Sequence, residues 1–314
     1  MQKQDTISRI LCPPLREAVG RMINHTVYPL EEIRLRVNRP AMAYAGRKKM
    51  FLTSQGRLSD SEDEGIQVTS AMLEKTLELM SNYSLYAYEQ ELKNGYITLE
   101  GGHRVGLCGK VVADGDRIKT IRFISSLNIR IAHEIIGCAD EIMPWIRGAQ
   151  GIYHTLLISP PRCGKTTLLR DLIRQISDGE KMQVGVVDER SEIAGCYRGI
   201  PQNTVGLRTD ILDGCPKQEG MLMLLRSMGP QVIAVDEIGR IEEIQAITTI
   251  VNSGVKLLCT IHGNSLDDFL NKPGMDELAA NRVFQRIIVL SGRKGPGTLE
   301  QIYDGEKGDY AVLL

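Results

Sequence analysis

The sequence lacks any apolar run of the roughly 18 to 20 residues that a membrane-spanning helix needs. Its start, MQKQD, also lacks the apolar core of a secretory signal. We therefore expect a cytoplasmic protein, and peripheral attachment through membrane proteins stays open.

Aromatic residues and excess charge of either sign are also scarce. Aromatics make up 5% of the chain, and 38 basic residues face 39 acidic ones, for a net charge of −1. This near-neutral balance excludes a globally basic nucleic-acid binder, although residues 47–49 (RKK) form a local basic patch. Proteins that bind single strands use basic and aromatic surfaces, so no stable nucleic-acid partner is expected.

The cysteines form no recognisable framework. There are seven, scattered along the chain without a CxxC pair. An odd, dispersed set is typical of reduced thiols and does not suggest a disulfide scaffold or a zinc site.

The chain is long enough, at 314 residues, for two domains. The first, residues 1–137, is predicted to be a smaller α+β domain. Its apolar periodicity predicts helices at 14–25, 70–83 and 86–92 and strands at 32–37, 96–99, 105–112, 118–124 and 127–132. Residues 54–65, rich in Ser, Asp and Glu, are predicted to form a solvated loop.

The second domain, residues 138–314, has a different pattern. After a connecting helix at 140–146, strands at 154–159, 183–187, 231–235 and 256–260 alternate with helices at 166–176, 220–228 and 241–251. This alternation predicts an α/β fold with a parallel sheet and helices on both faces.

A phosphate-binding loop follows the strand that ends in TLLIS. Gly164 lets the backbone approach a phosphate, Lys165 supplies a cation for the β and γ phosphates, and the Thr166 hydroxyl is placed to ligate Mg²⁺. The whole segment is a Walker A loop, with the predicted nucleotide contacts Ser159, Pro160, Pro161, Arg162, Cys163, Gly164, Lys165, Thr166 and Thr167. Ser159 and Arg162 stand where many such loops carry glycine, which affects the expected affinity.

An acidic pair ends the apolar strand VIAV. Ligands of open α/β sheets bind at the carboxyl ends of the strands, where this pair lies. Asp236 is predicted to hold Mg²⁺, and Glu237 to orient or deprotonate the attacking water.

Two further strand ends carry polar side chains. Glu192, in the segment after VVDE at 186–189, shares the predicted water-positioning role with Glu237. His262, in TIHG, is a candidate sensor of the γ phosphate, or else a buried structural histidine. Asp188 and Glu189 directly follow the strand at 183–187 and are predicted to lie at the same edge as the phosphate-binding loop. The alternative to a functional role there is helix capping or a surface turn.

These motifs together resemble the ATPases of type II and type IV secretion systems. VVDERSEIAG, VIAVDEIGR and TIHG follow the Walker A loop in the order of that superfamily's Asp box, Walker B and His box. Within it, EEIRLRVNRPA at 31–41, LYAYEQELKNGYITLEGGHRVGLCG at 85–109 and SSLNIRIAHEI at 125–135 resemble the stage III sporulation protein AA family.

The resemblance implies a RecA-like ATPase domain that works in a ring of six, with ATP bound between the two domains. It makes Arg130 and Arg122 candidate arginine fingers, with solvent-facing strand arginines as the alternative. Arg240 and Arg226 resemble arginines that flank Walker B. The implied partners are membrane proteins of a sporulation channel, met from the cytoplasmic side. Asp236 stands where secretion ATPases have Gly before the Walker B Glu, so the division of labour among Asp236, Glu237 and Glu192 stays open.

The predicted function is therefore that of a Mg²⁺-dependent ATPase motor of a secretion-type apparatus. Two alternatives remain. In the first, the chain is an ATP-binding assembly scaffold with negligible hydrolysis. In the second, it is a nucleic-acid-stimulated motor built on the same core.

Overall fold

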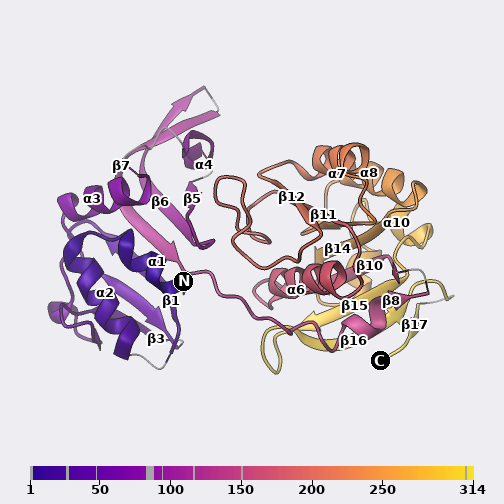
Figure 1. The fold of residues 1–314 in the computed structure, drawn as a ribbon, viewed down its shortest axis with the longest axis horizontal. Helices are drawn as coiled ribbons and strands as arrows, with labels where there is room; N and C mark the ends of the chain where they lie inside the picture. The colour runs from indigo at the N-terminus through magenta and orange to yellow at the C-terminus, as the bar shows by residue number, and fades with distance from the viewer. Residues whose placement is uncertain are drawn as a thin grey trace. The chain divides into compact units, whose positions relative to one another are not determined.

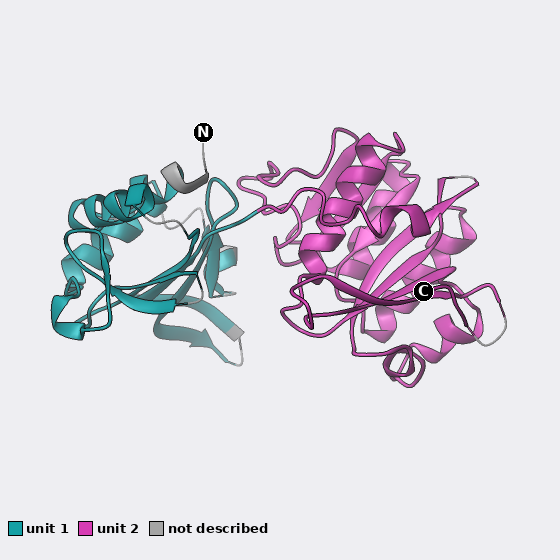
Figure 2. Ribbon diagram, turned by 90° about the horizontal axis from the view of Figure 1, so that it is seen from below, with its two compact units in different colours: residues 1–133 teal, residues 134–314 magenta. Residues whose placement is uncertain are grey.

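The structure is a computed structural model that describes residues 3–25, 28–46, 48–82, 88–93, 95–115, 117–149, 151–307 and 310–314. The chain forms two compact units, Met1–His133 and Glu134–Leu314 (Figure 2). Within the described part of the chain, no helix is both long and apolar enough to cross a bilayer.

Unit 1 is an antiparallel sheet with helices, as the sequence predicts. The strand order is β4-β3-β2-β1-β7-β6-β5 (Figure 1). The strands are β1 Leu30–Arg36, β2 Met42–Ala45, β3 Lys48–Leu52, β4 Leu58–Ser59, β5 Tyr96–Thr98, β6 Arg104–Asp114 and β7 Arg117–Arg130. The helices are α1 Lys3–Arg9, α2 Pro13–His25, α3 Ser70–Met80, α4 Glu89–Lys93 and the 3-10 turn η1 Glu62–Glu64.

Apolar spacing explains these elements. α2 buries Leu15, Val19 and Met22 at helical spacing, and β1 buries Ile33 and Leu35 at strand spacing. The predicted helix at 14–25 and strand at 32–37 are confirmed within one or two residues. Of the predicted helices at 70–83 and 86–92, residues 83–87 lie outside the described part.

One prediction in this unit is wrong: the strands at 118–124 and 127–132 are a single strand, β7. Cys108 pairs with Ser126 and Lys110 with Arg122, so residues 123–125 lie opposite Gly109 alone. This bulge bends β7 without ending it. The loop predicted at 54–65 contains β4 and η1.

Unit 2 is built on one mixed sheet with the order β12-β11-β13-β14-β10-β15-β16-β17. The first six strands in this order, β12, β11, β13, β14, β10 and β15, are parallel to one another. β16 and β17 add antiparallel pairs. Their bounds are β10 Thr155–Ser159, β11 Val184–Asp188, β12 Thr209–Asp213, β13 Val232–Val235, β14 Lys256–His262, β15 Arg286–Ser291, β16 Thr298–Asp304 and β17 Ala311–Val312.

Helices cover both faces of this sheet, which confirms the predicted architecture. α6, Lys165–Asp178, packs into the apolar core of one face. α7, Lys217–Ser227, and α8, Ile241–Asn252, pack into the core of the other. The smaller elements are α5 Met143–Ile146, β8 Arg147–Gly148, β9 Gly151–Ile152, α9 Leu266–Leu270 and α10 Asp276–Ala280.

The predicted connecting helix at 140–146 is reduced to α5, because residues 137–142 form turns. β12, the parallel strand β15 and the antiparallel strands β16 and β17 were not predicted from the sequence.

The parallel register aligns the strand ends at one edge. Ser159 of β10 pairs with His262 of β14, and Val235 of β13 pairs with both Val187 of β11 and Cys259 of β14. The residues that follow these strands therefore share that edge.

Candidate functional site

The loop between β10 and α6 turns sharply at Gly164. This residue has φ +81°, and a Cβ atom there would lie 3.1 Å from the Pro296 Cβ. Arg162 also adopts a positive φ, of +62°. Ser159 is fully buried and its hydroxyl donates to the Pro160 carbonyl at 3.1 Å, so this side chain points into the fold.

Lys165 is the first residue of α6 and is 5% exposed. Its ammonium donates to Asp236 Oδ1 at 2.9 Å, Glu237 Oε1 at 3.1 Å and Thr260 Oγ1 at 3.1 Å. A buried ammonium needs such anionic partners. The structure thus brings the predicted Walker A lysine to both Walker B carboxylates.

Asp236 lies between two hydroxyl groups. Thr166 Oγ1 donates to its Oδ2 at 2.6 Å, and Thr260 Oγ1 donates to its Oδ1. Burial acts to raise the pKa of Asp236, but the Lys165 charge and these hydrogen bonds outweigh it and hold the pKa below its usual range. The carboxylate is therefore ionised at neutral pH, as a Mg²⁺ ligand must be.

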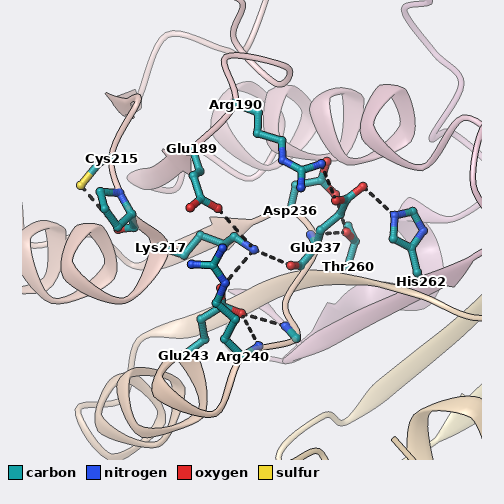
Figure 3. Close-up of polar contacts among 12 residues, drawn as sticks. Glu189, Arg190, Cys215, Lys217, Asp236, Glu237, Arg240, Glu243, Thr260 and His262 are labelled. Atoms are coloured by element: carbon teal, nitrogen blue, oxygen red, sulfur yellow. Dashed lines mark hydrogen bonds and ion pairs between the residues drawn. The ribbon is translucent and has the colours of Figure 1, made fainter. Parts of the chain in front are cut away.

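Glu237 adopts a left-handed backbone, with φ +57°. Its N–H donates to Thr260 Oγ1 at 2.9 Å. Its carboxylate contacts Arg190 Nη1 at 3.0 Å and His262 Nε2 at 2.8 Å (Figure 3). Partial burial acts to raise the pKa of Glu237, but the Lys165 ammonium outweighs it and lowers the pKa.

Lys217, at the start of α7, lies on the other side of Glu237 (Figure 3). Its ammonium donates to the Glu237 carbonyl and lies 3.1 Å from Glu243 Oε1 and 3.6 Å from Glu189 Oε2. Glu243 in turn accepts the N–H groups of residues 239 and 240. The backbone on both sides of Glu237 is therefore held by side chains of other elements.

Asp188 organises the loop after β11. Its buried carboxylate accepts the N–H groups of Glu192 at 2.9 Å, Ile193 at 3.0 Å and Ala194 at 2.8 Å. Burial raises its pKa to about 6, although these hydrogen bonds act in the opposite direction. The Arg170 guanidinium donates to the carbonyls of Glu192 and Ile193. Of the predicted alternatives for Asp188, these contacts favour a turn over a helix cap, because the described residues 189–200 after β11 form no helix.

A small cavity opens among these groups. It is lined by Val187, Asp188, Glu189, Arg190, Glu192, Lys217, Asp236 and Glu237. The structure therefore brings both candidate water-positioning carboxylates, Glu192 and Glu237, to one cavity.

The other predicted residues lie as follows. His262 is 41% exposed, which contradicts the alternative of a buried structural histidine. Arg226, in the last turn of α7, and Arg240, the residue before α8, are both exposed. Arg122 and Arg130 are exposed on β7 of unit 1, where Arg130 Nε lies 3.9 Å from Glu32 Oε2. Their role toward ATP stays a prediction.

Three residues of the site were not singled out from the sequence: Arg190, Lys217 and Thr260. For Thr260 a signal existed, because it precedes His262 by two positions on β14 and so shares its face of the sheet. Lys217 follows Pro216, a usual place for a helix to begin, but the helix was predicted to start at residue 220.

Comparison with known proteins identifies the family of the chain. The family model for "Sporulation stage III, protein AA" matches residues 1–310. The chain belongs to this family. It is 42% identical over 302 residues to the stage III sporulation protein AA of Bacillus subtilis (strain 168), covering 95% of this chain and 94% of that protein. It is also 30% identical over 190 residues to the protein SEEDLING PLASTID DEVELOPMENT 1 of Arabidopsis thaliana, covering 56% of this chain and 27% of that protein.

Solved structures resemble this family member in fold. The Legionella pneumophila ATPase DotB matches with a TM-score of 0.56 at 16% identity, covering 88% of this chain and 76% of that chain. The pilus retraction motor PilT, solved with bound ADP, matches with a TM-score of 0.58 at 16% identity and the same coverage. The fold is therefore that of the RecA-like secretion ATPases, as the sequence motifs predicted.

Proposed function

We propose that this protein is a Mg²⁺-dependent ATPase that binds ATP at residues 159–167. The contact that carries the proposal joins the Thr166 hydroxyl to the Asp236 carboxylate at 2.6 Å, beside the Lys165 ammonium. A hydroxyl and a carboxylate are hard oxygen donors, which Mg²⁺ takes together with phosphate oxygens. The ion would neutralise charge on the phosphates, and Lys165 would bind the β and γ phosphates.

Glu237 is the proposed acceptor for the proton of the attacking water. Its lowered pKa keeps it ionised at neutral pH, and a general base must be ionised to act. Arg190 and His262 hold the two oxygens of its carboxylate and so fix its direction. Glu192, at the same cavity, is the competing candidate for this role.

The fold likeness to DotB and PilT, and the ADP in the PilT structure, support a nucleotide-driven motor. We propose that the motor works as a homo-oligomeric ring, with six subunits as the resemblance implies. Arg122 and Arg130 of the N-terminal domain, residues 1–137, would complete the charge neutralisation. Membrane proteins of a sporulation channel would anchor it from the cytoplasmic side.

ATP hydrolysis against protein concentration, with and without Mg²⁺, tests the proposal. We expect turnover that requires Mg²⁺, rises as subunits assemble, and vanishes in Lys165→Ala. The matched control is Lys307→Ala, because this lysine lies in the same unit, is 65% exposed, and has its Nζ 3.8 Å from Asp304 Oδ2. A fluorescent ATP analogue measures binding separately.

Each alternative function predicts a different result. Tight binding of the analogue without hydrolysis at any concentration would support the scaffold. Hydrolysis that appears only with single-stranded DNA would support the nucleic-acid motor. Absence of Mg²⁺-dependent nucleotide binding would overturn the proposal altogether.

A further inference from the structure

The distal part of the β6–β7 hairpin forms a two-stranded arm, residues 109–114 and 117–123. Among the described strands, β1 pairs with β7 at residues 126–130 and β5 pairs with β6 at residues 104–106, so neither reaches the arm. Figure 1 shows the two strands extending past the rest of their sheet. An isolated pair of strands is marginally stable in water, which makes packing against a partner favourable.

The arm is amphipathic. Val111 pairs with Ile121 and Ala113 with Ile118, so these apolar residues share one face. Val111 is 49% exposed and Ile118 is 48% exposed. Lys110 pairs with Arg122 on the opposite face. In all, residues 109–123 contain four basic and two acidic residues.

The base of the arm is a strained bulge. Phe123 has φ +47° and is 80% exposed. A Cβ atom on Gly109 would lie 2.6 Å from the Arg122 carbonyl oxygen, so only glycine fits opposite the bulge. A left-handed aromatic residue is costly, and such strain is typical of functional positions.

The other edge of the same sheet carries the opposite charge. β4 is the edge strand there, and η1 follows it. The acidic corner consists of Asp60, Glu62, Asp63 and Glu64, all exposed. Residues 58–66 contain no basic residue.

We propose that the arm of one copy docks on the acidic corner of a second copy. The two surfaces are complementary in charge, and they belong to different strands of one sheet, β6 and β7 for the arm and β4 with η1 for the corner. In a docked pair, one copy therefore keeps its corner free and the other keeps its arm free. Such a head-to-tail contact propagates into a closed ring or an open filament.

Charge number favours a second copy over a lipid surface as the occupant. Polybasic segments that bind anionic lipid carry about 4 to 8 Lys and Arg residues in a cluster. The arm has four basic residues, but its acidic residues oppose them. The corner supplies four exposed carboxylates within five consecutive residues, 60–64. The inference rests on the ring proposed above and is independent of hydrolysis.

Charge reversal tests the contact. Lys110→Glu with Lys119→Glu gives an arm-reversed chain, and Glu62→Lys with Asp63→Lys gives a corner-reversed chain. The control, Arg21→Glu with Lys75→Glu, reverses two exposed charges on α2 and α3. Sedimentation velocity measures self-association in low and high salt, and thermal melting checks that each variant is folded.

We expect each reversed chain alone to associate at least about tenfold more weakly than the wild type or the control. An equimolar mixture should associate again, because the unmodified basic arm of the corner-reversed chain then meets the unmodified acidic corner of the arm-reversed chain. High salt should weaken wild-type association.

Three results would overturn the inference. One is association of the folded reversed chains at wild-type strength. Another is a mixture that associates no better than its parts. The third is loss of binding to phosphatidylserine vesicles in the arm-reversed chain with association intact, which would assign the arm to lipid. Binding of the fluorescent ATP analogue is measured in the same samples, so a failed nucleotide site is distinguished from a failed contact.

Discussion

The Thr260 hydroxyl accepts the backbone N–H of Glu237 at 2.9 Å while it donates to the Asp236 carboxylate. One side chain thus fixes both the left-handed backbone of Glu237 and an oxygen of the proposed Mg²⁺ ligand. It also accepts from Lys165 at 3.1 Å. Thr260 therefore contacts the Walker A lysine and both Walker B residues at once.

Removal of the Thr260 hydroxyl is expected to lower turnover more than it lowers ATP binding. Thr260→Val keeps the shape but leaves the Glu237 N–H unpaired, and loss of such a partner typically costs about 10-fold to 100-fold in activity. Thr260→Ser keeps the hydroxyl and should restore most of the turnover. Steady-state kinetics measures both. Equal turnover in Thr260→Val and the wild type would contradict the positioning role.

Topology explains why much of the site could be predicted from the sequence. Strands β10 and β13 are buried throughout, and parallel strands end at one edge of a sheet. Lys165 and Asp236 follow these strands, so their contact follows from the fold class. The contacts of Arg190 and Lys217 could not be predicted, because long side chains reach across several elements and their rotamers depend on tertiary packing.

The errors in the fold have similar causes. β16 pairs antiparallel to β15, and no local pattern distinguishes such an addition from a surface hairpin. β7 was predicted as two strands because its apolar alternation breaks at the bulge near Phe123. A bulge changes the period without ending the ladder, and its partner, Gly109, lies on the preceding strand, where the local pattern of β7 does not show it.

The two candidate water-positioning carboxylates are separated by matched substitutions. Glu237→Gln should lower hydrolysis by about 10²-fold to 10⁴-fold, because an amide cannot accept the proton. ATP binding should persist, since Lys165 keeps its contact with Asp236. Glu192→Gln should retain turnover near the wild-type value. Single-turnover hydrolysis and analogue binding measure the two effects, and the reverse pattern would assign the base to Glu192.

Gly164 is expected to be required for nucleotide binding beyond its effect on stability. Gly164→Ala places a Cβ atom 3.1 Å from Pro296 and 3.3 Å from the Gly297 nitrogen, at φ +81°. The control is Gly254→Ala, which has φ +82° and no atom within 4 Å of the added Cβ. Both variants should lose about 1 to 2 kcal/mol of unfolding free energy. Nucleotide affinity should fall in Gly164→Ala alone; an equal fall in both would show that the loop itself is not the binding site.

Acid is expected to destabilise unit 2 through His154. This residue directly precedes β10, so it lies at the opposite end of that strand from the proposed nucleotide site. This ring is 9% exposed, and its Nδ1 accepts the Leu257 N–H at 3.2 Å. Burial, with the nearby Lys256 charge, lowers the pKa of His154 to about 4. The unfolded chain binds this proton at its ordinary pKa of 6.5, so stability is lost as the pH falls from about 6.5 toward 4.

His154→Asn should remove this pH dependence, because the Asn side chain offers an acceptor but no titration in this range. The difference in unfolding free energy between the wild type and His154→Asn should shrink or reverse as the pH falls, by up to about 3 kcal/mol. Urea unfolding at pH 7, 6, 5 and 4 measures it. Other titrating groups act in both proteins and cancel in the difference. Parallel curves for the two proteins would mean that His154 is protonated in the folded state, which its acceptor role toward Leu257 does not allow.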